Sequence, residues 1–142
     1  MTKYCFGIDI GGTTVKCGLF QTDGQLCEKW EIITRTENNG KAIIPDVAET
    51  IINKMKEKNL TKDMVVGVGV GIPGPVVGER EVAMAVNLHW GYTKMADELE
   101  PLIYNIPVKV GNDANVAALG EMWKGGGDRV RSEERRVGKE CR

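Results

Sequence analysis

Three strand-like segments follow one another near the start of the chain, with only short turns between them. Residues 3–10 alternate apolar with small or polar side chains, and residues 15–21 and 26–34 are further strand-like runs. Gly11-Gly12 and Thr22-Asp23-Gly24 supply the turns. Because such short turns join antiparallel neighbours, the three segments are predicted to form a meander within a sheet.

The hydrophobic period then changes to that of a helix over residues 41–60. The apolar residues at helical spacing are Ile44, Val47, Ala48, Ile51, Ile52 and Met55. Pro45 is compatible with the first turn of this helix, and the lysines at 54, 56 and 58 suit its carboxyl end. The segment is therefore predicted to be an amphipathic helix.

The remaining segments continue the alternation of strands and helices. In order, they are a buried strand at 65–70, a Gly/Pro loop at 71–75, irregular or short-stranded chain at 76–92, a helix at 92–104, a strand at 108–110 and an alanine-rich helix that ends at Gly125-Gly126-Gly127. The order β-β-β-α-β-α-β-α has no internal repeat. It predicts one α/β domain in which a meander leads into a parallel crossover sheet.

Composition narrows the function classes. The chain has 142 residues, 27% of them charged, and a net charge of -1, so it lacks the basic excess with which proteins hold nucleic acid. No apolar run is long enough to cross a bilayer and no secretory signal is readable, so we expect a cytoplasmic protein without a membrane partner. Cys5, Cys17, Cys27 and Cys141 lack metal-type spacing and are expected to be free thiols.

Residues 131–142 differ from everything before them, with one aliphatic side chain and no periodicity. All twelve match the codon-by-codon translation of a common short-read sequencing adapter. We therefore interpret residues 1–130 as a truncated natural domain and residues 131–142 as a non-native tail.

Three segments could carry chemistry. Asp9 and the turn Gly11-Gly12-Thr13-Thr14 could hold phosphate through backbone N–H groups and hydroxyls, with Asp9 facing a metal, although Gly-Gly is also an ordinary hairpin turn. Asn112 and Asp113 stand where a strand meets a helix, a place for a proton-accepting carboxylate but also for a helix cap. The loop at 69–75 could line a pocket, or be no more than a rigid loop.

Asn87, His89 and Trp90 follow closely behind that loop. An amide and an indole together suit a sugar, but a single tryptophan is more often a packing residue. His89 is the only histidine in the chain, and we interpret it as a surface residue.

Together these segments resemble the ROK family of bacterial sugar kinases, and most closely its glucokinases from Gram-positive bacteria. The matching stretches are residues 6–18, 69–76, 87–91 and 112–121. The resemblance implies the actin-like, RNase H-type ATPase fold, with this chain as the N-terminal small domain of the hexokinase superfamily. It also implies ATP-dependent phosphorylation of glucose to glucose 6-phosphate.

The same resemblance implies residue roles. Asp113 would be the general base, and Asn112, Gly74 and Asn87 would lie on the sugar side. The ATP-phosphate side would comprise Asp9, Gly11, Gly12, Thr13 and Thr14, with Asp9 beside Mg²⁺. His89 stands where the family pattern leads us to expect glycine.

The family's kinases are considerably longer than this sequence. Their zinc site, adenosine pocket and further sugar contacts lie in a part that is absent here, so we expect the isolated chain to be inactive and the full-length parent to be a homodimer. A ROK kinase for fructose, mannose or an N-acetylated hexosamine is the alternative enzyme. A sugar-sensing ROK repressor is a second alternative, against which the strand beginning at residue 3 argues, because such repressors carry a DNA-binding segment first. A non-catalytic fragment is the third.

Overall fold

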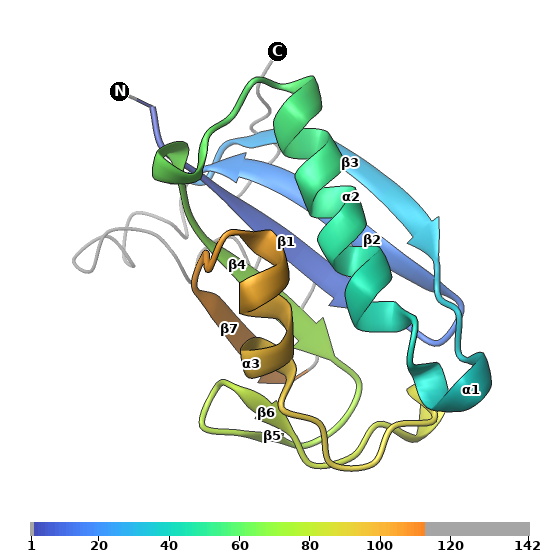
Figure 1. Ribbon diagram of the computed structural model, residues 1–142. Coiled ribbons are helices and arrows are strands. Elements are labelled where there is room, and N and C mark those ends of the chain that lie inside the picture. Colours follow the sequence, from blue (N-terminus) through green and yellow to red (C-terminus); the bar gives the residue numbers. More distant parts are fainter. Residues whose placement is uncertain (1, 113–142) are drawn as a thin grey trace.

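The computed structural model of the chain describes residues 2–112, and five strands form its central sheet (Figure 1). These strands are β1 (Tyr4–Ile10), β2 (Thr14–Gln21), β3 (Leu26–Ile33), β4 (Val65–Ile72) and β7 (Val108–Asn112). Their order across the sheet is β3-β2-β1-β4-β7. The first three are antiparallel neighbours, whereas β1, β4 and β7 run parallel. The predicted meander and crossover sheet are thus confirmed.

Helices α2 (Ile43–Glu57) and α3 (Met95–Leu99) lie on the same face of the sheet (Figure 1). Between β4 and α3 come the small hairpin of β5 (Val76–Val77) and β6 (Glu81–Val82) and a 3-10 turn, Val86–Leu88. Two further 3-10 turns, Lys62–Met64 and Glu100–Ile103, and the short α1 (Glu37–Gly40) complete the described elements.

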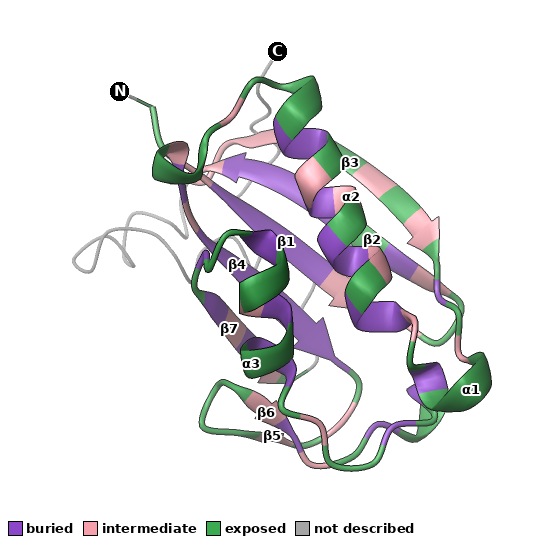
Figure 2. Cartoon of the chain, in the orientation of Figure 1, coloured by how far each residue is buried: buried purple, intermediate pink, exposed green. Residues whose placement is uncertain are grey.

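The core lies between the sheet and these helices. Figure 2 shows buried residues along the sheet strands and along the side of α2 that faces them. Phe6, Ile8, Val47, Ile51 and Val70 are among the residues with no exposed surface. The helical spacing read from the sequence therefore identifies the packed face of α2 correctly.

Three predicted boundaries are wrong, two because of pairing with other strands and one because of a proline. The strand predicted at 65–70 continues through Gly71 and Ile72, because these residues pair with Gly111 and Asn112 of β7. The helix predicted to begin at residue 92 begins at Met95 instead, since the chain just before it is still paired with β6 through a bridge between Val82 and Thr93. It also gives way to a 3-10 turn that contains Pro101, whose missing N–H cannot continue an α-helix.

The start of the helix predicted at 41–60 also differs. Asn38, Asn39 and Gly40 all have positive φ angles, of 57°, 62° and 66°, so α1 is a left-handed turn rather than a regular helix. Asparagine and glycine tolerate this conformation better than other residues. Helix α2 itself begins at Ile43, with Pro45 in its first turn as expected.

An ionic network fixes the carboxyl end of α2 to β3. Lys54 Nζ lies 2.7 Å from Glu28 Oε2 and 3.0 Å from Glu57 Oε1, and Lys58 Nζ lies 2.8 Å from Glu28 Oε1. The same Nζ of Lys54 sits 4.6 Å above the ring of Trp30. Only 8% of Lys54 is exposed. Lys54 is therefore a packed member of the α2–β3 contact, beyond its expected role at the helix end.

The hairpin of β5 and β6 covers part of the β7 edge. The Val110 N–H donates to the Glu79 carbonyl at 2.7 Å. Arg80, next along the hairpin, pairs with Asp97 at 2.8 Å and with Glu100 at 3.0 Å. These contacts attach the hairpin to β7, to α3 and to the turn that follows α3.

Candidate active site

The carboxyl ends of the three parallel strands bring the predicted site segments to one edge of the sheet. In the strand register Asp9 of β1 pairs with Gly71 of β4, and Gly71 pairs in turn with Gly111 of β7. Asn112 follows one residue later, opposite Ile72. Open α/β sheets bind ligands at this edge, because strand-end loops converge there.

The glycine turn, residues 11–14, connects β1 to β2 at that edge. The Gly11 N–H donates to the Thr14 carbonyl at 3.0 Å, which closes the turn. Gly12 and Thr13 are exposed at its tip, whereas Thr14 is partly covered as β2 begins. A tight turn with exposed backbone and hydroxyl groups can approach phosphate oxygens closely.

The glycine turn also meets the segment that carries Asn87. A Cβ added at Gly12 would lie 3.3 Å from the Asn87 Cβ, which is a tight contact. Asn87 is exposed on the 3-10 turn Val86–Leu88. The predicted phosphate side and the predicted sugar side are therefore in contact across the site.

Asn112 and Gly74 are joined directly. The Asn112 Nδ2 group donates to the Gly74 carbonyl and lies 3.4 Å from the Ile72 carbonyl. A Cβ at Gly74 would overlap the carbonyl oxygen of Met84. Glycine at this position therefore has a packing reason as well as its predicted place on the sugar side.

Asp9 is half-buried at the end of β1. Among residues 2–112 no group of three or more His, Cys, Asp or Glu side chains is placed to hold a metal ion. Mg²⁺, however, commonly uses one or two carboxylates and takes its other ligands from phosphate oxygens and water. A single carboxylate beside a phosphate-sized turn fits that pattern.

The structure thus brings together Asp9, Gly11, Gly12, Thr13, Thr14, Gly74, Asn87 and Asn112. Asp113, the helix expected after it and the tail at 131–142 lie outside the described residues.

Trp90 is a packing residue. It is 7% exposed, and its indole Nε1–H donates to the Gly40 carbonyl at 3.0 Å. His89 is exposed, as expected, and has a φ of 64°. Glycine adopts this left-handed backbone more easily than other residues do, which gives a physical reason for the glycine that the resemblance led us to expect at position 89.

Sequence reasoning missed Thr34. This residue is 7% exposed at the end of β3, and its hydroxyl donates to the Gly11 carbonyl at 2.8 Å. Its own N–H donates to the Thr13 carbonyl at 2.9 Å. The available signal was a threonine at the end of a predicted strand. Strand periodicity, however, does not indicate which group its hydroxyl bonds to, because Gly11 of the glycine turn is 23 residues away in the sequence.

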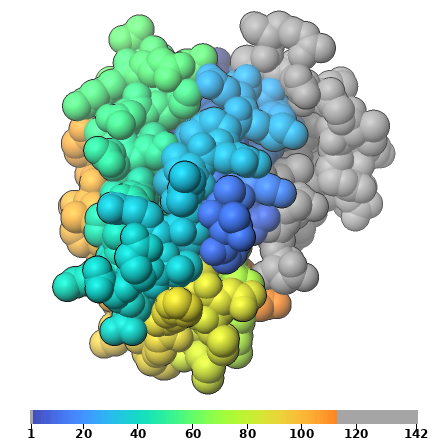
Figure 3. All heavy atoms as spheres, turned by 90° about the vertical axis from the view of Figure 1, so that its right-hand side faces the viewer, coloured from blue at the N-terminus to red at the C-terminus, as the bar shows by residue number. Residues whose placement is uncertain are grey.

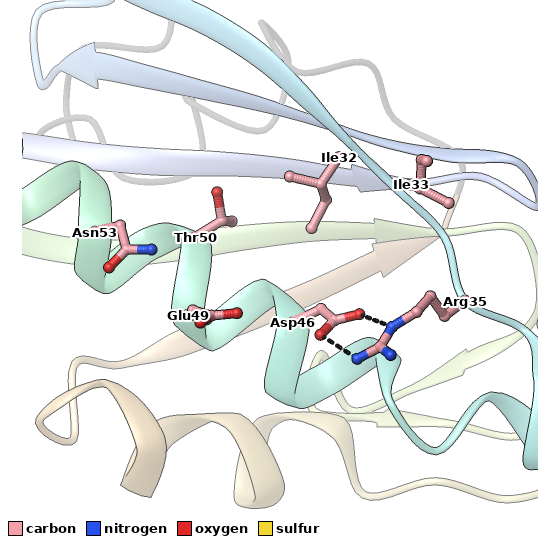
Figure 4. A pocket seen from close by; sticks show the side chains of 7 residues that line it. All are labelled: Ile32, Ile33, Arg35, Asp46, Glu49, Thr50 and Asn53. Carbon is pink, nitrogen blue, oxygen red and sulfur yellow. Dashed lines mark hydrogen bonds and ion pairs between the residues drawn. The ribbon is translucent and has the colours of Figure 1, made fainter.

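A separate groove of about 370 Å³ lies between β3 and α2 (Figure 4). It is lined by Ile32, Ile33, Arg35, Asp46, Glu49, Thr50 and Asn53. Arg35 and Asp46 close one end with paired contacts of 2.8 and 2.9 Å. The groove contains none of the predicted site residues.

The three cysteines within residues 2–112, at positions 5, 17 and 27, take part in no disulfide bond. Burial, together with the nearby charge of Glu31, raises the pKa of Cys17 to about 12, against a smaller opposing effect of Lys54. A thiol that stays protonated is a poor nucleophile. Cys17 is therefore a core packing residue.

None of the helices in residues 2–112 has the length and hydropathy of a membrane span.

Comparison with known proteins decides the family. The model of the ROK family matches residues 5–132. The chain belongs to the ROK family. A glucokinase of Halalkalibacterium halodurans is 38% identical over 127 residues, which cover 89% of this chain and 38% of that glucokinase.

Solved structures show the fold directly. A ROK glucokinase from Streptomyces griseus, solved with glucose and AMPPNP, matches with a TM-score of 0.68 and 29% identity over 87% of this chain and 38% of that one. The actin-like ATPase fold expected from the sequence is confirmed. The chain spans under two fifths of the length of either glucokinase.

The family also contains proteins with other names. An N-acetyl-D-glucosamine kinase of Pectobacterium carotovorum is 27% identical over 83% of this chain and 37% of its own length. A xylose repressor of Caldicellulosiruptor bescii is 27% identical over 84% of this chain and 30% of its own length. ROK membership therefore covers both sugar kinases and repressors.

Proposed function

We propose that this chain is part of an ATP-dependent glucokinase, which transfers the γ-phosphoryl group of ATP to the 6-hydroxyl of glucose. The observation that carries the proposal is the meeting of the glycine turn with Asn87 at the sheet edge where Asn112 contacts Gly74. The 38% identity to a glucokinase, against 27% to an N-acetyl-D-glucosamine kinase, supports glucose over an N-acetylated hexosamine.

On the nucleotide side, the glycine turn would hold the ATP phosphates through backbone N–H groups and the hydroxyls of Thr13 and Thr14. Asp9 would hold Mg²⁺ together with phosphate oxygens. When bound, Mg²⁺ neutralises charge on the phosphates, which phosphoryl transfer requires. Asp9 and the turn thus supply the positioning that a loose transition state needs.

On the sugar side, the geometry gives Asn112 a definite polarity. Its Nδ2 group faces the carbonyls of Ile72 and Gly74, so its Oδ1 is the atom left to accept a hydrogen bond from a sugar hydroxyl. Asn87 would contribute a second polar contact opposite. These groups would fix the sugar so that its 6-hydroxyl faces the phosphates.

Asp113 would accept the proton of the 6-hydroxyl as it attacks phosphorus. We test this with Asp113→Asn in the complete kinase that contains residues 1–130, with Asp23→Asn in an exposed turn as the matched control. Loss of a general base costs about 10²- to 10⁴-fold in rate. We expect that loss for Asp113→Asn with glucose binding retained, and unchanged turnover for the control. Turnover of Asp113→Asn within twofold of the unmodified kinase would show that the carboxylate only caps a helix.

The substrate is tested with a panel of glucose, fructose, mannose and N-acetylated hexosamines. We expect the highest kcat/KM for glucose. A higher kcat/KM for another sugar would show that this sugar, and not glucose, is the substrate. Sugar binding without turnover would favour a sensing role like that of a ROK repressor.

We also propose that the 142-residue chain alone has no kinase activity. Catalysis by proximity needs both reactants held in one water-poor cleft. The chain corresponds to under two fifths of the glucokinases it matches. Turnover of glucose by the purified 142-residue chain at about 1 s⁻¹ or faster, a rate typical of enzymes, would refute this.

A further inference from the structure

The segment between β3 and α2 contacts both sides of the proposed site. We define this connector as residues 34–40. It begins at the buried Thr34 and ends in the left-handed turn of Asn38, Asn39 and Gly40. In Figure 3 the cyan atoms of this region lie beside the blue atoms of the first residues and the yellow atoms of the loop that carries Asn87.

At its first residue the connector holds the glycine turn. The Thr34 hydroxyl donates to the Gly11 carbonyl at 2.8 Å, and the Thr34 N–H donates to the Thr13 carbonyl at 2.9 Å. These two bonds reach both sides of the turn tip at Gly12. The residue that follows β3 thereby holds the turn in addition to the two strands that the turn joins.

At its other end the connector holds the loop that carries Asn87, which we define as residues 85–90. The Trp90 Nε1–H donates to the Gly40 carbonyl at 3.0 Å, and His89 Nδ1 lies 3.0 Å from the Thr36 carbonyl. A Cβ on Gly40 would overlap the Leu88 carbonyl. The loop is therefore seated on the connector without intervening space.

We propose that the connector is a positioning element that sets the glycine turn and the 85–90 loop at the separation needed for phosphoryl transfer. This inference rests on the proposed function, because it assigns the turn to ATP and the loop to the sugar. The turn and the loop approach each other where Gly12 faces Asn87. The connector forms hydrogen bonds with the turn at Thr34 and with the loop at Thr36 and Gly40. Loss of the bond at Thr34 should therefore loosen the turn alone, and loss of the bond at Gly40 should loosen the loop alone.

The first test follows backbone amides by hydrogen exchange in the 142-residue chain. Thr34→Val removes the hydroxyl at similar volume, and Thr34→Ser restores it. We expect Thr34→Val to speed exchange of the Gly11 amide about fivefold, the effect of one lost hydrogen bond, and Thr34→Ser to reverse most of this. The Leu88 and Trp90 amides, both bonded to the Ala85 carbonyl, should not change.

Trp90→Phe should speed exchange of the Leu88 and position-90 amides and leave that of the Gly11 amide unchanged, because it removes the hydrogen bond to Gly40 and keeps those of Thr34. Two matched controls remove the same groups elsewhere: Thr50→Val and Trp30→Phe each break the 2.9 Å bond from Trp30 Nε1 to Thr50 Oγ1. All rates are scaled to the Ile51 amide of α2, so that a general loss of stability cancels. Variants that change both amide sets together, or neither set, would overturn the inference.

The second test measures Michaelis constants in the complete kinase. We expect Thr34→Val to raise KM for ATP about fivefold with KM for glucose unchanged, and Trp90→Phe to do the reverse, whereas the controls change neither. Equal changes in the two Michaelis constants would overturn the inference, even if each variant speeds hydrogen exchange in one element only. If the unmodified kinase phosphorylates no sugar, the proposed function fails, and the exchange test alone still decides whether the connector holds the two elements.

Discussion

The glycine turn and the 85–90 loop stand at the same edge of the sheet but are held in different ways. The turn joins two antiparallel strands, and its closing hydrogen bond joins Gly11 to Thr14, three positions apart in the chain. The connector adds hydrogen bonds from Thr34 to this turn, whereas it seats the 85–90 loop as a whole, through contacts such as that of Trp90 with Gly40, 50 residues earlier in the chain. The shape of the turn is therefore encoded locally, whereas the place of the loop depends on tertiary packing.

The substitution Gly40→Ala is expected to have the largest effect on this difference, because it acts on the contact that places the loop. Gly40 has a φ of 66°, and a Cβ there would overlap the Leu88 carbonyl. Strain and overpacking together should lower the free energy of unfolding by roughly 3 kcal/mol. Urea unfolding measures this, with Gly78→Ala as control, because Gly78 has a φ of 61° and nothing near its Cβ. A loss no greater than that of the control would show that the loop does not need this contact.

The next effect in size lies away from both regions. Hydrogen bonds from Lys54 and Lys58 lower the pKa of Glu28 from its ordinary value of 4.5. Because the folded-state pKa is the lower one, this carboxylate stabilises the fold above about pH 4.5 and loses its contribution as the pH falls through the folded-state value.

We therefore expect Glu28→Gln to lower the free energy of unfolding by about 1 kcal/mol at neutral pH and to flatten its fall below pH 4.5. The exposed Glu98→Gln serves as control. Urea unfolding from pH 3 to 7 gives both curves. Parallel pH profiles for Glu28→Gln and the unmodified chain would contradict the role of this pair.

Gly12→Val should separate stability from function. Gly12 is exposed, so the free energy of unfolding should change by under about 1 kcal/mol. The branched side chain would nevertheless stand beside the exposed backbone N–H groups proposed to hold the ATP phosphates, and should raise KM for ATP in the complete kinase far more than KM for glucose, although its Cβ would also lie 3.3 Å from the Asn87 Cβ. Gly91→Val, with open space at its Cβ, is the matched control. An equal rise of both constants would indicate misfolding instead.

The smallest effect is expected for His89→Gly. Glycine relieves a left-handed φ of 64°, which is worth about 1 kcal/mol, but it also removes the contact with the Thr36 carbonyl, worth a similar amount. Thermal unfolding should therefore place the variant within about 0.5 kcal/mol of the unmodified chain. His89→Ala loses the contact without relieving the strain and should be clearly less stable. Equal stability of the two variants would contradict this account.

Local patterns in the sequence predicted most of the fold. Period-2 alternation located β1, and the spacing of Val47 and Ile51 located the packed face of α2. Boundaries were wrong where pairing with distant chain extends or delays an element, as at Gly71 and at Thr93. Such pairings have no local signature.

In the candidate site, too, the features with a local sequence pattern were predicted and those that depend on distant contacts were not. The glycine turn and the strand end at Asn112 were predicted as candidate site segments from their residue types, whereas Gly74 was predicted as a site residue only through the resemblance to the ROK family. The sequence did not identify Thr34, whose role depends on β3 returning beside the turn. The pattern Asn38-Asn39-Gly40 was a readable signal for a left-handed turn, but nothing local indicates that Trp90 rests on it.

The bond from Val110 to Glu79 has a consequence for self-association. An outer strand with unbonded N–H and C=O groups can recruit the same strand of another molecule, which is the first step of β-type aggregation. At β7 this donor is already taken by the hairpin turn. At the opposite outer strand, β3, the exposed Lys29 and Glu31 place charges along the sheet margin. Both margins of the described sheet therefore carry features that discourage its growth from one molecule to the next.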